Sequence, residues 1–312
     1  MNGLATEGTE GTENDDVAGR RSCSVARLFD HFPEEQRAIP RMHLTDTSPV
    51  LELLGAAPSR PLRIVSLYPS GTETLYAVGL ASRVVGRTSW CPVPTDGAPP
   101  TAMGGTKDPD LAAIRASTPD LVLACRDENR KEDVEAIAGF APVAVANPRR
   151  VADVPEFVRK LAEVSGGEAG KAEALASLIE DESARLVASA EPRRRGVAFI
   201  WRGPWWTLGG DCYATDLLRL CGIDNAFAAD RRTYFSLDGA SIAAARPDVL
   251  LFPDEPFPFN EFHVAALRTE IPALREIPAR LFDGSLLTWH GVRTLDALRR
   301  LPALLRPLAE IR

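Results

Sequence analysis

The strongest constraint on the fold of this 312-residue chain is an internal duplication. Residues 108–128 read DPDLAAIRASTPDLVLACRDE, and residues 238–255 read DGASIAAARPDVLLFPDE. Each segment contains a short helical run, a Pro-Asp break, an apolar strand and a polar loop that ends in Asp-Glu. A second pair lies upstream, where residues 73–86 and 215–227 both begin as an amphipathic helix that is followed by glycine. Two copies in the same order predict two similar lobes, and a cleft between lobes is a common place for a small ligand.

Strands alternate with helices in both predicted lobes. The apolar run 63–68 is typical of a buried strand, and residues 73–79 predict the helix that follows it. In the second lobe, residues 196–201 predict the first strand, and short late strands are expected at 281–282 and 286–288. This alternation favours mainly parallel sheets. The expected fold class is α/β, with two similar Rossmann-like lobes and a cleft between them.

The segment between the lobes has a helical composition. Residues 151–195 are rich in Ala, Glu, Lys and Leu, and their apolar residues recur at helical spacing on both sides of Gly166-Gly167. This pattern predicts one helix, a break, and a second helix of about 20 residues that spans ~30 Å. Such a connector is stiff, so we expect the lobes to close by only a few degrees. The expected divisions are a disordered tail (1–41), an N-terminal α/β lobe (42–150), a helical connector (151–195) and a C-terminal α/β lobe (196–312).

Composition excludes several classes of function. A net charge of −7 argues against a nucleic acid or an anionic membrane as partner, and no apolar stretch approaches the ~20 residues of a membrane-spanning helix. Residues 1–22 have a disordered composition without the apolar core of a secretory signal, and Cys23 lacks the preceding apolar run of a lipoprotein signal. These features predict a cytoplasmic location. We also expect a monomer without a covalently bound cofactor.

The tryptophans are the strongest local signal for a binding site. Trp90, Trp205, Trp206 and Trp289 lie in loops that follow predicted strands, and ligands of α/β sheets bind at the carboxyl ends of strands. Trp201 lies on a predicted strand and is expected in a core. The adjacent rings of Trp205 and Trp206 cannot easily face one core, so at least one of them is expected in the cleft.

Signals for catalysis or for a resident metal are weak. The chain has no nucleophile motif, no P-loop and no GxGxxG, and its five cysteines show no paired spacing, which indicates reduced and buried thiols. His290 is the one histidine expected in a strand-end loop, where it acts either as a hydrogen-bonding group or as a single axial ligand to a chelated metal. An enzyme would need paired acid and base groups, for which the candidates are Asp211, Asp254, Glu255 and His290. We expect no metal site and no catalytic residues.

Three segments together resemble a known family. RIVSLYPSGTETLYAVGL at 63–80, VVG at 84–86 and the pattern DLAAI…TPDLVL within 110–123 resemble the class III substrate-binding proteins of ABC importers. These are helical-backbone receptors for cobalamin, ferric siderophores and haem. The resemblance covers about residues 61–305 and is greatest to the cobalamin-binding proteins. It implies two α/β lobes that are joined by one long helix.

The resemblance also implies a function and a site. The expected protein is a receptor that clamps a metal chelate, a corrinoid first of all, for uptake by an ABC permease; a ferric siderophore or haem is the alternative ligand. A cytosolic enzyme or accessory protein of metal-cofactor metabolism on the same fold is the alternative function. The acids that dock on the permease map to within one residue of Glu132 and onto Asp211, which are the expected docking residues. Cys125 stands where the cobalamin binder has an aromatic residue. The candidate ligand-binding residues are Tyr68, Trp90, Arg126, Trp205, Trp206, Trp289, His290 and Arg293.

Overall fold

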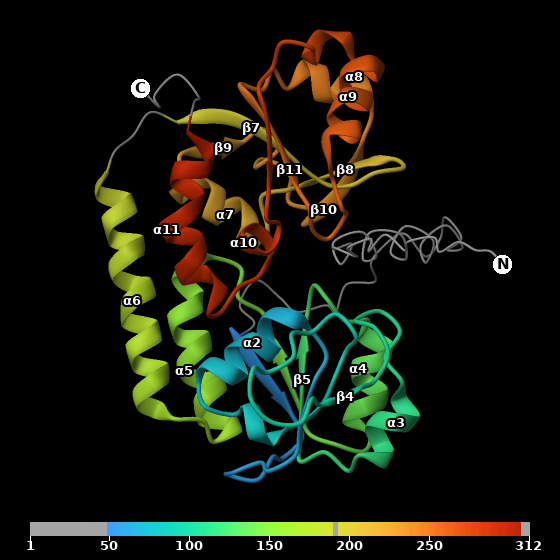
Figure 1. Ribbon diagram of the computed structural model, residues 1–312, viewed down its shortest axis with the longest axis vertical. Coiled ribbons are helices and arrows are strands. Elements are labelled where there is room, and N and C mark those ends of the chain that lie inside the picture. The colour runs from blue at the N-terminus through green and yellow to red at the C-terminus, as the bar shows by residue number, and fades with distance from the viewer. Residues whose placement is uncertain (1–48, 190–192, 307–312) are drawn as a thin grey trace, which may run out of the picture. The chain divides into compact units, whose positions relative to one another are not determined.

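The computed structural model describes residues 49–189 and 193–306. The tail that was expected at residues 1–41 lies outside these ranges. The described chain forms two mixed sheets of six strands each, with helices packed against them (Figure 1). This architecture agrees with the α/β prediction.

The first lobe is built on a mainly parallel sheet with the strand order β1-β6-β5-β2-β3-β4, in which only β1 runs antiparallel to its neighbour. Every residue of β5 and β6 is buried, as expected for strands that are covered on both faces. Alternate residues of β5 enter two different hydrophobic cores, one on each face of the sheet. The elements are β1 (Leu51–Leu54), β2 (Ile64–Ser66), α2 (Pro69–Ala77), η2 (Ala81–Arg83), β3 (Val84–Arg87), β4 (Thr101–Ala102), α3 (Leu111–Ala116), β5 (Leu121–Cys125), α4 (Lys131–Ala138) and β6 (Val143–Ala146).

The second lobe has the strand order β10-β8-β7-β11-β12, with β9 paired to β7. Strands β9, β7, β11 and β12 are parallel, whereas β8 and β10 run antiparallel to their neighbours. The elements are β7 (Arg194–Trp201), β8 (Trp205–Leu208), α7 (Tyr213–Leu220), β9 (Ile223–Asn225), β10 (Tyr234–Leu237), α8 (Gly239–Ala244), β11 (Val249–Pro253), α9 (Glu261–Glu270), η4 (Pro272–Leu274), β12 (Ala279–Phe282), α10 (Ser285–Thr288) and α11 (Arg293–Leu305).

Two local predictions in this lobe were wrong. Trp205 and Trp206 belong to strand β8 and not to a loop, because the chain turns back after β7 and pairs with it as a hairpin. Residues 286–288 form the helical turn α10 and not a strand. The carboxylate of Asp283 accepts hydrogen bonds from the backbone N–H and the hydroxyl of Ser285, at 3.1 and 2.6 Å, and so starts a helical turn.

The duplicated sequence folds into duplicated local structure. Helices α3 and α8 begin after Asp110 and Asp238, and each carboxylate accepts a hydrogen bond from the backbone N–H three residues later, at 2.9 and 2.7 Å. Soon after each helix ends, a non-glycine residue adopts a positive φ, which is 46° at Thr118 and 44° at Arg246. Both residues immediately precede the Pro-Asp pair of the repeat.

The aspartate of each Pro-Asp pair ties the repeat to the adjacent strand. Asp120 accepts hydrogen bonds from the backbone N–H groups of Leu62 and Arg63 just before β2, at 2.8 and 3.0 Å. Asp248 accepts the equivalent bond from Arg195 in β7, at 2.7 Å. The Pro-Asp repeat is therefore a structural anchor in both lobes.

A pair of helices connects the lobes. After η3 (Val151–Asp153), α5 (Val154–Ser165) ends at Gly166, whose φ of +65° favours glycine, and α6 (Ala169–Ala188) follows as the expected 20-residue helix. Helix α6 packs against α5 at one end and against α11 of the second lobe toward the other end (Figure 1). One hydrophobic core runs through both lobes and this connector. The lobes are therefore joined by continuous packing as well as by the chain.

Candidate functional site

The centre of the region between the lobes is aromatic and uncharged. His290, which follows α10, is buried and packs against Tyr68, Phe157 and Tyr213, with ring centroids 5.6, 5.0 and 6.2 Å away. Its Nε2 lies 3.7 Å from the Sγ of Cys125 at the end of β5. Burial lowers the pKa of His290 to about 3, so its imidazole is neutral near pH 7.

Three buried polar atoms in this region have no hydrogen-bond partner among the described residues. They are the hydroxyl of Tyr68, Nδ1 of His290 and the amide nitrogen of Asn147. Burial, with smaller effects from the charges of Cys125 and other neighbours, raises the pKa of Tyr68, which keeps its hydroxyl protonated. A buried donor without a partner typically costs ~1–3 kcal/mol. These atoms are therefore candidate contacts for a bound ligand.

A segment of the second lobe is bonded to helix α2 of the first lobe. Arg293 donates to both carboxylate oxygens of Glu73, from Nε at 3.1 Å and from Nη2 at 2.5 Å. Next to this ion pair, the backbone N–H of Val292 donates to the hydroxyl of Thr74 at 3.1 Å. Gly291 has a φ of +81°, and a Cβ on it would overlap Thr74. The close approach of the two lobes at this point therefore requires glycine.

Trp289 is held by a second carboxylate. Its indole N–H donates to Glu255, which follows β11, at 2.9 Å. Burial raises the pKa of Glu255 to about 7, the Trp289 bond opposes this, and the charges of Glu128 and Asp254 raise it further. Glu128 and Glu255 end the two copies of the duplicated segment. The matching acidic loops of the two lobes thus influence each other electrostatically.

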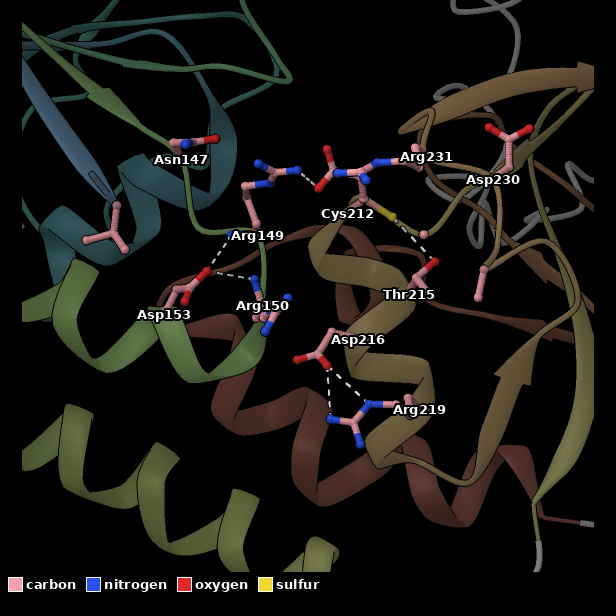
Figure 2. Close-up of a pocket in the computed structure, with 14 residues that line it drawn as sticks. Asn147, Arg149, Arg150, Asp153, Cys212, Thr215, Asp216, Arg219, Asp230 and Arg231 are labelled. Carbon is pink, nitrogen blue, oxygen red and sulfur yellow. Dashed lines mark hydrogen bonds and ion pairs between the residues drawn. The ribbon is translucent and has the colours of Figure 1, made fainter. Parts of the chain in front are cut away.

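A pocket of about 900 Å³ lies between the segment after β6 and the start of helix α7 (Figure 2). Its charged lining contains four arginines and four aspartates, so their formal charges cancel. Arg149 forms an ion pair with Asp211, and Asp216 accepts a hydrogen bond from the backbone N–H of Val151 at 2.9 Å. The lining residues are Val50, Asn147, Arg149, Arg150, Asp153, Gly210, Asp211, Cys212, Thr215, Asp216, Arg219, Ala228, Asp230 and Arg231.

None of the predicted ligand-binding residues belongs to the lining of this pocket. Of all the predicted site residues, only the proposed docking acid Asp211 lines it. Arg126 connects the predicted site to the pocket. Its Nη1 donates to the Oδ1 of Asn147 at 3.1 Å, and Asn147 lines the pocket. Tyr68, His290, Trp289 and Arg293 are brought together at the lobe contact described above.

Trp205 and Trp206 lie on opposite faces of strand β8 and therefore have different surroundings. Successive residues of a strand point to opposite faces. Trp205 is buried in the core of the second lobe, where it stacks on Phe259 and donates to Glu270 at 2.8 Å. Trp206 is half-buried and packs on the core that both lobes share. Trp90, in the loop after β3, is 45% exposed.

The two proposed docking acids have different surroundings. Glu132 is exposed in the first turn of α4, where its carboxylate lies 3.8 Å from Nε of Arg130. Asp211 is partly covered and paired with Arg149. Glu73 and the Arg149-Arg150 pair were not among the site residues predicted from the sequence. The arginine pair follows Asn147-Pro148, the first two residues after β6, and the rule that ligands bind at the carboxyl ends of strands would have found it.

The described residues contain free thiols but neither a metal-binding cluster nor a membrane-spanning helix. Cys91, Cys125, Cys212 and Cys221 are buried free thiols, as expected. Among the residues in the described ranges, no three His, Cys, Asp or Glu side chains are grouped so as to hold a metal ion. No helix in the same ranges combines the length and apolar character that crossing a membrane requires.

Comparison with known proteins gives consistent matches. A family model described as "Periplasmic binding protein" matches residues 64–279. The chain is 26% identical over 211 residues to the vitamin B12-binding protein of Pectobacterium carotovorum, covering 66% of this chain and 76% of that protein. The corresponding protein of Photorhabdus laumondii is 24% identical over 194 residues, covering 61% and 70%.

Two solved structures show the same fold. The periplasmic vitamin B12 binding protein of Vibrio cholerae superimposes with a TM-score of 0.68 at 20% identity, covering 82% of this chain and all of that one. The apo form of the periplasmic heme-binding protein RhuT from Roseiflexus superimposes with a TM-score of 0.65 at 25% identity, covering 79% and 98%. Both agree with the predicted two-lobe architecture.

Proposed function

Because this chain belongs to the periplasmic binding protein family, we propose that it is a receptor that binds a corrinoid between its lobes and delivers it to an ABC permease. The matches to vitamin B12-binding proteins support the corrinoid, and the general role of a substrate-binding receptor follows from the family. The family also corrects one expectation. The predicted cytoplasmic location was wrong, since the matching family and both structural neighbours are periplasmic binding proteins.

The chemistry of the lobe contact supports binding over catalysis. The Cys125–His290 pair is the arrangement that would most favour an enzyme, since a thiol activated by a neighbouring base is a common nucleophile. Burial raises the pKa of Cys125 and lowers that of His290, so both groups are neutral near pH 7 and neither activates the other. The proteins that match this chain are likewise binding proteins.

The charge balance of the pocket favours a corrinoid over haem as the ligand. Four arginines and four aspartates offer both hydrogen-bond donors and acceptors without a net charge. A primary amide needs both, whereas a carboxylate only accepts and gains most from a positively charged site. The amide-bearing rim of a corrinoid fits this lining better than the carboxylates of haem. Trp206 and Trp289 would supply the flat apolar contacts.

Haem is the second candidate ligand. The likeness to RhuT at 25% identity favours it, and so does the unpartnered Nδ1 of His290 between the lobes. Ferric siderophores remain a third class of metal chelate. In each case the ligand is the cargo of the receptor and not a resident cofactor.

Titration of the purified chain tests the proposed ligand. Cyanocobalamin should quench the intrinsic tryptophan fluorescence saturably, and Trp206→Ala and Trp289→Ala should each weaken binding by roughly tenfold or more, as for an aromatic hot spot. Phe262→Ala is the matched control, because it removes an aromatic ring that is 73% exposed on α9. Binding of haemin without binding of cyanocobalamin would reverse the order of the candidates. No binding of any metal chelate would overturn the proposal.

The permease is tested separately. Glu132 is exposed and free to meet a basic partner, whereas Asp211 would have to exchange Arg149 for the partner's charge. Reversing both charges should abolish transport in a reconstituted system, because such charges act on docking. Reversal of Glu132 alone should leave ligand affinity unchanged, whereas reversal of Asp211 also alters the charge balance of the pocket that Asp211 lines. Normal transport by the double variant would remove both residues from the docking surface.

A further inference from the structure

Arg293 is fully engaged by acids of the protein itself. Its Nε and Nη2 donate to the two oxygens of Glu73, and Nη1 lies 3.7 Å from the carboxylate of Asp296. The side chains of Arg293 and Glu73 are only 22% and 26% exposed, which shields the ion pair from solvent. Every arm of the guanidinium group therefore already faces a carboxylate.

Contacts of the backbone next to this ion pair hold Glu73 and Arg293 in position across the two lobes. Glu73 and Thr74 are consecutive residues of α2, and they bind Arg293 and the backbone N–H of Val292, respectively. The glycine at 291 lets the two backbones approach, as shown above. The ion pair is therefore preorganised and does not depend on two freely moving side chains.

This arrangement has a consequence for ligand recognition. Arginine binds a carboxylate best through two parallel N–H donors, and Glu73 occupies both. A carboxylate on a ligand would have to displace Glu73, or else lie beside two acids that repel it. A neutral amide on a ligand meets neither obstacle.

We propose that Glu73 is a specificity-determining residue, which occupies Arg293 and so makes the site between the lobes reject ligands with carboxylates at their rim in favour of ligands with neutral amides. The proposal rests on the proposed function, since it assumes that the ligand binds between the lobes. Glu73 would act by keeping ligand carboxylates away from Arg293, whereas the pocket lining favours amides because it offers them both hydrogen-bond donors and acceptors.

Matched ligand pairs test the role of Glu73. Dicyanocobinamide and dicyanocobyrinic acid share a corrin ring but carry amides and carboxylates at the rim, and haemin and its dimethyl ester differ only in two carboxylates. The wild type should bind the uncharged member of each pair at least ~10-fold more tightly. Glu73→Gln should reduce this ratio by about tenfold, through tighter binding of the acid, because a charged guanidinium becomes available. Glu156→Gln, which removes an exposed acid paired with Lys160 on α5, should leave the ratio unchanged.

The outcomes separate this proposal from the proposed function. Wild-type binding with an unchanged ratio in Glu73→Gln overturns the role of Glu73 and leaves the receptor function standing. If Glu73→Gln does not fold, Asp296→Asn takes its place, because it removes an acid near Arg293 without opening the two-bond pair. It should lower the ratio by about two- to threefold, and no change would overturn the proposal. If the haem pair binds and the two corrins do not, the corrinoid is rejected as the ligand. The ratio of the affinities for haemin dimethyl ester and haemin then still tests the role of Glu73. Absence of binding for all four ligands overturns both.

Discussion

Replacing Glu255 by glutamine should make the protein more stable at pH 8 but not at pH 5. Glu255 has a pKa of about 7 in the folded state, against an ordinary value of 4.5, chiefly because burial disfavours its charge. Between these two values the folded state binds more protons than the unfolded state. The free energy of unfolding therefore falls as the pH rises from about 4.5 to about 7, and then levels off.

The size of the effect follows from the same two values. Each pH unit between them corresponds to ~1.36 kcal/mol, which sets a ceiling of about 3 kcal/mol on the cost of ionising Glu255 in the folded protein. The side chain is partly exposed, so solvent screening reduces this, and we expect about 1–2 kcal/mol. Glutamine keeps an oxygen that accepts the hydrogen bond from Trp289. The substitution therefore removes the charge without leaving the indole N–H unpaired.

Urea unfolding of the wild type and Glu255→Gln at pH 5 and pH 8 measures the difference. The variant should gain about 1–2 kcal/mol relative to the wild type between the two pH values. Glu156→Gln controls for the loss of an exposed carboxylate and should show no such gain. A difference that does not change with pH, or a variant that is less stable at pH 8, would refute the electrostatic argument.

Three further results are expected. Asp120→Ala and Asp248→Ala should each lower the free energy of unfolding by about 1 kcal/mol in urea titrations, because each leaves strand N–H groups without their acceptor; unchanged midpoints would contradict the anchoring role. Trp205→Ala should cost about 3–5 kcal/mol of stability as a core truncation, whereas Trp90→Ala should cost under ~1 kcal/mol in the same assay; equal losses would argue against the opposite placement of these rings. Small-angle scattering with and without ligand should show closure of only a few degrees, since α6 packs against both α5 and α11; closure by tens of degrees would show that this packing breaks.

The fold was largely predictable because the duplication repeats structural residues as well as apolar ones. Asp110 and Asp238 cap helices, and Asp120 and Asp248 anchor strands, so the same letters recur wherever the same bonds are needed. Hairpin β7–β8 was missed, because Gly203-Pro204 marks a break in the chain but does not say that the next residues pair with the previous strand.

The site was less predictable, for reasons that depend on single residues. The sequence places Trp205 and Trp206 side by side, but only the register of β8 decides which ring faces the core of the second lobe. Glu73 and Arg293 are 220 residues apart, and no local pattern indicates that they meet. The sequence predicted correctly that His290 lies in a loop, although this loop follows the helical turn α10 and not a strand. The neutral state of His290 depends on burial by Tyr68, Phe157 and Tyr213 from other parts of the chain.

The packing of α6 along both lobes also limits how a partner can tell a loaded receptor from an empty one. Because α6 contacts both α5 and α11, we expect the surfaces of the two lobes to keep nearly the same spacing in the empty and the loaded state. A partner that touches both lobes would then gain little information from the distance between them. The signal of occupancy has to come from a local change, and segment 289–293 is well placed to give one, since it is bonded to Glu255 of its own lobe and to α2 of the other.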